Sequence, residues 1–320
     1  MNEITASKKS SNKRVYVQNK KGFKRKFLES RYLLLLFLPC FIYLVMFKYA
    51  PMWGILIAFK NYKLSVGLLH SPWVGFKHFV TFFQNPMALK LIRNTFLLGL
   101  YSLLWGFPMP IILALVLNEV RMVKVKRFIQ TVSYLPYFIS TVVIAGMLRE
   151  FLSPNGVINQ LIRSLGGHTI VFFNYASWFR TIYISSDIWQ FVGWGAIIYI
   201  AALSNIDTEL YNSASIDGCN KFQKIIHIDI PGIAPTIIIL FLLNTGSILS
   251  VGFEKILLLY NPLLYDTADV ISTYMYRAGF TGSPDYGYAA AVGLFQTVVC
   301  FAFILMSNTI AKKVSETNLW

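Results

Sequence analysis

The sequence predicts an all-α membrane protein with six transmembrane helices, and two observations support this fold class. Hydrophobic residues make up 56% of the 320 residues and charged residues only 13%, and the mean hydropathy is +0.55. A soluble domain carries about 25% charged residues. The apolar residues also gather into long uncharged runs, five of which approach or exceed the roughly 20 residues that a helix needs to cross a bilayer. These runs are 94–118, 128–148, 188–206, 230–253 and 286–311. A soluble enzyme, a disulfide scaffold and a disordered chain are excluded.

The first 31 residues are expected to form a basic cytoplasmic tail, followed by a transmembrane domain over 32–320. The tail is polar, holds ten of the 29 Lys and Arg residues, and lacks the apolar core of a signal peptide. The first span is expected over 32–47. It is short, and the flanking side chains of Arg31 and Lys48 can extend to the two membrane interfaces. A second apolar stretch, Met52–Phe59, is expected to lie at the interface or against the other helices.

Five further spans complete the six. They are expected at about 94–118, 128–148, 184–206, 232–252 and 288–311. Pro108 and Pro110 should bend the second span, because a proline removes a hydrogen bond of the helix. Pro136 lies in the third, and a mixed loop over 149–180 precedes the fourth.

The net charge of +15 reflects topology rather than nucleic-acid binding. With the amino terminus inside, the segments 1–31, 119–127, 204–231 and 312–320 carry 18 basic residues, and the three external segments carry 11. The excess of basic residues on one side places both termini of this multi-pass membrane protein in the cytoplasm. The three cysteines are far apart and match neither a disulfide framework nor a metal spacing.

No pattern for catalysis is found in this sequence. It contains no H-E-x-x-H, no G-x-S-x-G and no G-x-x-x-x-G-K-[ST], so we predict no catalytic residue, no metal site and no ATP site in the chain. Asp187 leaves two hypotheses open. It could relay protons in a secondary transporter, or it could be an interfacial residue at the outer end of the fourth span.

The cytoplasmic loop 209–230 is the most informative segment. Its pattern predicts two short helices, with one apolar face around Leu210 and Ala214 and another around Phe222 and Ile225. Gly218 can adopt a positive φ between them, and Pro231 is expected to stop the second helix before the fifth span. The apolar faces need either a protein partner or contact with the chain's own helices, and both remain open.

This loop resembles the Glu-Ala-Ala loop of binding-protein-dependent ABC importer permeases, in which E-A-A-x-x-x-G precedes I-x-L-P. The matching positions are Asn212-Ser213-Ala214, Asp217-Gly218 and Ile228-Asp229-Ile230-Pro231. The chain also resembles the carbohydrate-uptake branch of this family from about residue 30 to 312. Within that branch it is most similar to permeases for maltose-type sugars and for polysaccharide-derived oligosaccharides. The residues that carry this resemblance are Ala202-Leu203, Ile206, Glu209-Leu210-Tyr211, Gly75-Phe76 with Phe79, Asn94-Thr95, Leu135-Pro136-Tyr137 and Tyr286-Gly287-Tyr288 with the alanines to Ala291.

The resemblance implies a type I importer permease that performs no chemistry itself. It implies as partners a second homologous permease, two ABC ATPase subunits that bind ATP and Mg, an extracytoplasmic solute-binding protein, a carbohydrate substrate and membrane lipid. The residues that it assigns to ATPase coupling are Glu209, Leu210, Asn212, Ser213, Ala214, Asp217, Gly218, Phe222, Ile225, Ile228 and Pro231. Asn212 stands where the family has Glu, so the ion pair that this carboxylate makes with the ATPase is lost.

A sugar path needs aromatic rings to stack on pyranose rings and amides or hydroxyls to bond hydroxyl groups. Gln190 and Trp194 are i, i+4 neighbours on the fourth span, and Asn244, Ser247 and Ser250 form a stripe on the fifth. In related maltose-type permeases the sugar contacts lie on these two helices. The alternative is that these polar residues hydrogen-bond between helices. The sequence therefore predicts a permease subunit of an ATP-driven oligosaccharide importer, with a proton-coupled secondary transporter using Asp187 as the alternative.

Overall fold

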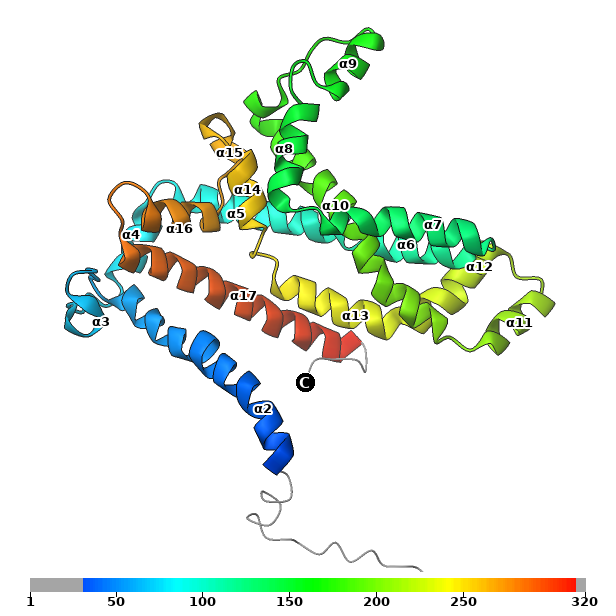
Figure 1. Cartoon of the computed structure of the whole chain (residues 1–320), viewed down its shortest axis with the longest axis horizontal. Helices are drawn as coiled ribbons and strands as arrows, with labels where there is room; N and C mark the ends of the chain where they lie inside the picture. The colour runs from blue at the N-terminus through cyan, green and yellow to red at the C-terminus, as the bar shows by residue number, and fades with distance from the viewer. Residues whose placement is uncertain (1–30, 315–320) are drawn as a thin grey trace, which may run out of the picture. The chain divides into compact units, whose positions relative to one another are not determined.

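The computed structural model describes residues 31–314, and within this range it contains helices and a single bridge between Lys60 and Trp73 (Figure 1). The expected tail, 1–31, lies outside the described residues except for Arg31. The described residues fall into two units, 31–54 and 55–314. The fold confirms the prediction of an all-α membrane protein, because five helices are long and apolar enough to cross a membrane and a bent pair raises the number to six.

The first candidate span is one helical segment, Arg31–Phe59, built from α2 (Arg31–Leu44), the π-helix η1 (Val45–Tyr49) and the 3₁₀-helix η2 (Ala50–Phe59). The expectation of a span ending at residue 47 and a separate stretch Met52–Phe59 was wrong. Lys48 does not end the helix, since it lies in the π turn and the helical hydrogen bonding continues past it.

The second and third spans are each interrupted. α5 (Ala88–Tyr101) and α6 (Pro108–Glu119) are joined by a π turn, η3 (Ser102–Gly106), directly before Pro108. A wider turn makes room for the proline ring. The third span runs through α7 (Val123–Tyr134) and η4 (Leu135–Phe138), and then bends by 100° into α8 (Thr141–Phe151). The expected span 128–148 is therefore not one helix, because it begins inside α7 and ends inside α8, across the bend.

The fourth span, α10 (Ala176–Ser204), begins eight residues before the predicted start at 184, so it absorbs the end of the expected loop. The fifth was also misjudged. α12 (Lys221–Lys224), the π-helix η6 (Ile225–Asp229) and α13 (Ile230–Gly246) form one candidate span, Lys221–Gly246. Pro231 therefore does not stop a helix: the π turn before it lets the helix continue through the proline. The sixth span is α17 (Tyr286–Val314), of which Tyr286–Ile310 is the candidate membrane segment.

Short helices connect the spans. They are α3 (Gly67–His70), α4 (Lys77–Gln84), α9 (Val157–Ser164), η5 (Phe172–Asn174), α11 (Thr208–Ile216), α14 (Phe253–Leu259), η7 (Pro262–Leu264), α15 (Tyr265–Ala268) and α16 (Ile271–Phe280).

In the unit 55–314, α10 is the central helix. It packs along α6 and also contacts α7 and α13, while α17 packs on α13 and α16 (Figure 1). Small residues allow these close approaches: a Cβ on Gly193 would lie 2.1 Å from the carbonyl oxygen of Ser133. One buried cluster, around Leu115, Tyr199 and Ile233, joins α6, α10 and α13 near the loop 209–230. At most a third of the residues in each candidate span are buried in the single chain (0–33%), which fits contact with lipid or a second subunit.

Candidate functional site

The loop 209–230 has the predicted helix–turn–helix geometry. The Asp207 carboxylate caps α11 by accepting a hydrogen bond from the Glu209 N–H at 2.9 Å. Gly218 has φ +75°, and a Cβ placed on it would meet nothing within 4 Å. Glycine is therefore favoured here because of the positive φ, and not because a neighbouring atom leaves no room for a side chain. Asn220 and Gln223 then form a reciprocal capping box at 2.8 and 2.9 Å, which starts α12.

The apolar residues of this loop divide between the two roles that the sequence left open. Ala214 is buried, and Ile225 packs against the cluster around Tyr199 and Ile233. Leu210, Ile216 and Phe222 are exposed. Of the other residues assigned to coupling, Ile228 is half-buried, and the exposed ones are Glu209, Asn212, Ser213, Asp217, Gly218 and Pro231. The loop is thus held to its own span on one side and presents apolar side chains on the other.

Tyr211 and Asp229 hold α11 to the fifth span. The Tyr211 hydroxyl donates to Asp229 Oδ1 at 2.5 Å, and Asp229 is fully buried. Burial, followed by the hydrogen bond and charge of Asp229, raises the pKa of Tyr211 to about 12, so this hydroxyl remains protonated and donating at neutral pH. The sequence indicated Asp229 only as a member of the motif Ile228-Asp229-Ile230-Pro231. The available signal was an acidic residue between two isoleucines, two positions before a proline.

Two cavities meet between the second, fourth and fifth spans. One of about 370 Å³ lies among η3, α6, α10 and α13, and one of about 170 Å³ continues it toward residues 247–252. Both are lined by Ser102, Asp187 and Asn244. Ser247 and Ser250 also line the smaller one. The three predicted residues therefore share a cavity, but they do not form a stripe on a helix, because α13 ends at Gly246 and both serines lie in the turn beyond it.

The polar groups of these three residues are not used to join the helices of the described chain, apart from a Ser250 Oγ contact with Cys300 Sγ at 3.9 Å. Asn244 Nδ2 donates to the Leu240 carbonyl oxygen of its own helix at 2.8 Å, and the Ser247 hydroxyl also bonds its own helix. Their remaining hydrogen-bonding capacity faces the cavity, as a polar path requires.

Gln190 and Trp194 do not line either cavity. Gln190 is buried and donates to the Ile139 carbonyl oxygen at 3.4 Å, which joins the fourth span to the break in the third. Trp194 is 44% exposed and stacks on Tyr137 with ring centroids 4.2 Å apart and an interplanar angle of 4°. These two residues therefore share a helix face but not a site with Asn244.

Asp187 lies well inside α10, not at an outer end of the span as expected. Its carboxylate pairs with the Lys255 ammonium of α14 at 2.5 Å, and Lys255 is only 3% exposed. The rings of Tyr183 and Phe191 lie 5.9 and 5.8 Å from the same ammonium. This ion pair was missed from the sequence, although a lysine within the apolar segment Phe253–Leu259 is the signal that could have indicated it.

Together these features define a multi-span membrane transport subunit: apolar spans around two cavities that carry a few polar groups in their walls, with a structured loop at the end of two spans. The family model for the binding-protein-dependent transport system inner membrane component matches residues 106–316, and the chain belongs to this family. It is a multi-pass inner-membrane permease subunit of an ABC importer, and a transport component rather than an enzyme. The alternative of a proton-coupled secondary transporter finds no support in these comparisons.

Several relatives match nearly the whole chain. Protein LplB of Bacillus subtilis (strain 168) is 45% identical over 291 residues, which cover 91% of each protein. The polygalacturonan/rhamnogalacturonan transport system permease protein YteP of the same organism is 40% identical, with 92% of each covered. A chain in the crystal structure of a bacterial alginate ABC transporter, in complex with an alginate pentasaccharide-bound periplasmic protein, is 42% identical with a TM-score of 0.86. That match covers 93% of this chain and 100% of the other. The fold is therefore that of a type I ABC importer permease.

Proposed function

We propose that this chain forms, with a second and homologous permease, the membrane path for an oligosaccharide, and that two ATPase subunits drive it through loop 209–230. The observation that carries the proposal is the pair of connected cavities with Asn244, Ser247 and Asp187 in their walls, on the same helices that border the coupling loop. Amides, hydroxyls and a carboxylate are the groups that bond sugar hydroxyls. Relatives named for polygalacturonan and alginate transport support a saccharide substrate.

The proposed assembly places both termini in the cytoplasm, since the basic residues concentrate on that side. ATP and Mg bind to the ATPase subunits, and this chain contributes the exposed apolar side chains of Leu210, Ile216 and Phe222 to their contact. An extracytoplasmic binding protein delivers the sugar. The periplasmic protein bound to the alginate transporter, and the family description itself, support this partner.

The proposal is tested by uptake in cells that carry or lack this chain. The cells are offered a mixture of neutral and uronate-containing oligosaccharides, and imported sugars are identified by mass. We expect uptake that requires the chain, stops when arsenate depletes ATP and continues when a protonophore collapses the proton gradient. Uptake with the opposite dependence, or no oligosaccharide uptake at all, contradicts the proposed function.

The same assay examines the aromatic stack beside the fourth span. Trp194→Ala removes the ring that stacks on Tyr137, outside the two cavities. If this stack is a further part of the proposed path, the sugar concentration for half-maximal uptake should rise by up to about tenfold. Trp178→Ala is the matched control, because Trp178 packs edge-on against Phe172 near the start of α10. Equal effects of the two substitutions, at equal abundance in the membrane, contradict a role for Trp194 in the path.

A further inference from the structure

A third cavity, of about 350 Å³, lies between the second span and the first half of α10. Two aromatic rings, Tyr101 and Trp105, line one wall, and Arg180, Thr181 and Ser185 line the other. The ring of Trp105 is 65% exposed. The cavity shares Ile184 and Ile188 with the 370 Å³ cavity, so the two are neighbours along α10.

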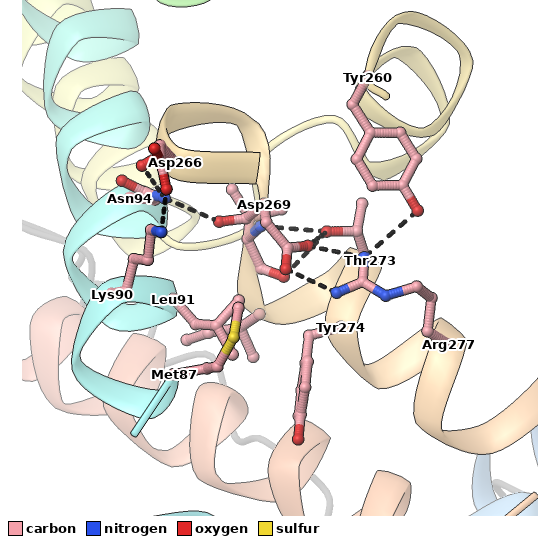
Figure 2. Close-up of polar contacts among 12 residues, drawn as sticks. Met87, Lys90, Leu91, Asn94, Tyr260, Asp266, Asp269, Thr273, Tyr274 and Arg277 are labelled. Carbon is pink, nitrogen blue, oxygen red and sulfur yellow. Dashed lines mark hydrogen bonds and ion pairs between the residues drawn. The ribbon is translucent and has the colours of Figure 1, made fainter. Parts of the chain in front are cut away.

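Arg180 is held in this cavity by a neutral partner. Its Nη2 donates to Asn94 Oδ1 at 3.0 Å, and Asn94 is buried. The amide nitrogen of Asn94 in turn donates to the backbone carbonyl oxygens of Asp266 and Asp269 at 3.0 and 3.1 Å, as Figure 2 shows. These two bonds fix the amide so that its oxygen faces the guanidinium.

The neighbouring carboxylates already have other cations. Figure 2 shows Asp266 paired with Lys90, and Asp269 bonded to Arg277 through two nitrogens, at 2.8 and 2.6 Å. Burial opposes the charge of Arg277, but its hydrogen bonds to Asp269 and the charge of that carboxylate outweigh burial and raise the pKa of Arg277. Both acids are therefore committed to these pairs.

Arg180, in contrast, makes no ion pair with any residue of the described range 31–314. Its Nε–H is buried and has no hydrogen-bond partner among these residues. The nearby charge that acts on it from Arg93 has the same sign. A half-buried cation without a counter-charge costs free energy, and an anionic ligand in the cavity would recover it through its charge.

We infer that this cavity binds the carboxylate of an acidic sugar residue, so that the imported oligosaccharide contains uronate. The inference rests on the proposed function and specifies its substrate class. The guanidinium of Arg180 offers a planar fork that matches a carboxylate, and the ring of Trp105 offers a face for the pyranose ring. Thr181 and Ser185 add hydroxyl groups on the same wall.

The uptake assay with mixed neutral and uronate-containing oligosaccharides separates this inference from the proposed function. In the intact importer, Arg180→Gln is expected to lower uptake of uronate-containing sugars about tenfold or more relative to any neutral sugar. The matched control is Arg163→Gln, which removes an exposed arginine of α9. Trp105→Leu is the second variant, because its exposed ring can be changed without disturbing the core, and it should also weaken uronate uptake.

Import of neutral oligosaccharides alone would overturn the inference and leave the proposed function standing. An unchanged ratio of uronate uptake to neutral-sugar uptake in Arg180→Gln would also overturn the inference. If Arg180→Gln fails to assemble, the same ratio is measured in Trp105→Leu, and an unchanged ratio there overturns the inference. Native mass spectrometry of the purified complex tests whether the cavity binds a lipid instead of a sugar. An anionic lipid that is retained by the wild type and lost from Arg180→Gln would assign the cavity to a lipid phosphate instead.

Discussion

Asp187→Asn is expected to destabilise the protein by about 3–5 kcal/mol, because it leaves the ammonium of Lys255 buried without its counter-charge. Lys255 is 3% exposed, and its nearest other neighbours are the rings of Tyr183 and Phe191, which cannot replace a carboxylate. The expected result is a low yield of the complex from membranes and a lower midpoint of thermal unfolding in detergent. Because Asp187 also lines both cavities, the fraction that folds should transport poorly.

A double variant distinguishes the ion pair from other effects. Asp187→Asn with Lys255→Met removes both charges, and we expect it to recover most of the lost stability, since a buried pair replaced as a whole is tolerated better than half a pair. Lys90→Met is the control: Lys90 pairs with Asp266 where both side chains are exposed, and such a pair contributes only about 0–1 kcal/mol. If Asp187→Asn alone is as stable as the wild type, the pair does not hold α14 to α10.

The five candidate spans, and the bent pair that could be a sixth, could be predicted because the signal for a membrane helix is local: a run of apolar residues without charge. Their ends could not be predicted in the same way. α10 begins at Ala176 and contains Arg180 and Asp187. A prediction that ends each span at a charged residue therefore places the start of α10 too late. Both side chains have partners on other segments, Asn94 and Lys255, so their helical positions depend on tertiary structure.

Proline was interpreted too simply as a helix terminator. The fifth span passes through Pro231 by way of the π turn Ile225–Asp229, so the second short helix of the loop is the start of the span itself. The break in the third span had a readable sequence signal. Ser140 caps α8 by accepting from the Val143 N–H at 3.4 Å, and serine shortly after Pro136 favours a new helix start.

In the candidate site, too, the features set by nearby residues could be predicted from the sequence, and the contacts between distant segments could not. The turn at Gly218 follows from residue type, and the structure has it. Asn244, Ser247 and Ser250 line one cavity, but not through helical spacing, because α13 ends at Gly246 and the two serines lie in the turn beyond it. Gln190 has helical spacing to Trp194 yet bonds the Ile139 carbonyl oxygen, because spacing gives a helix face and not the neighbour of that face. The pairs Tyr211–Asp229 and Asp187–Lys255 join segments that only the folded chain brings together.

Tyr211→Phe is expected to uncouple ATP hydrolysis from transport. The substitution removes one hydroxyl and leaves Asp229, which is fully buried and whose Oδ2 has no partner in the described chain, without its hydrogen-bond donor. A lost hydrogen bond to a buried charged group costs about 2–3 kcal/mol. The weakened contact is the one between α11 and the start of the fifth span, so α11 should move more freely against the helix that carries Asn244.

The measurement compares ATPase activity and sugar uptake of the complete importer in proteoliposomes. We expect Tyr211→Phe to co-purify with its partners and hydrolyse ATP while its sugar uptake falls about tenfold or more. The exposed side chains of Leu210 and Phe222 remain in place for docking, but the contact between α11 and the fifth span is weakened.

Asp229→Asn in the Tyr211→Phe background should restore part of the uptake, because burying a neutral amide costs less free energy than burying an unpartnered carboxylate. The exposed Tyr175 provides the control, and Tyr175→Phe should leave both activities unchanged. Wild-type uptake by Tyr211→Phe would show that motion reaches the fifth span through the continuous helix from Lys221 alone, and that the contact between Tyr211 and Asp229 is not part of the coupling.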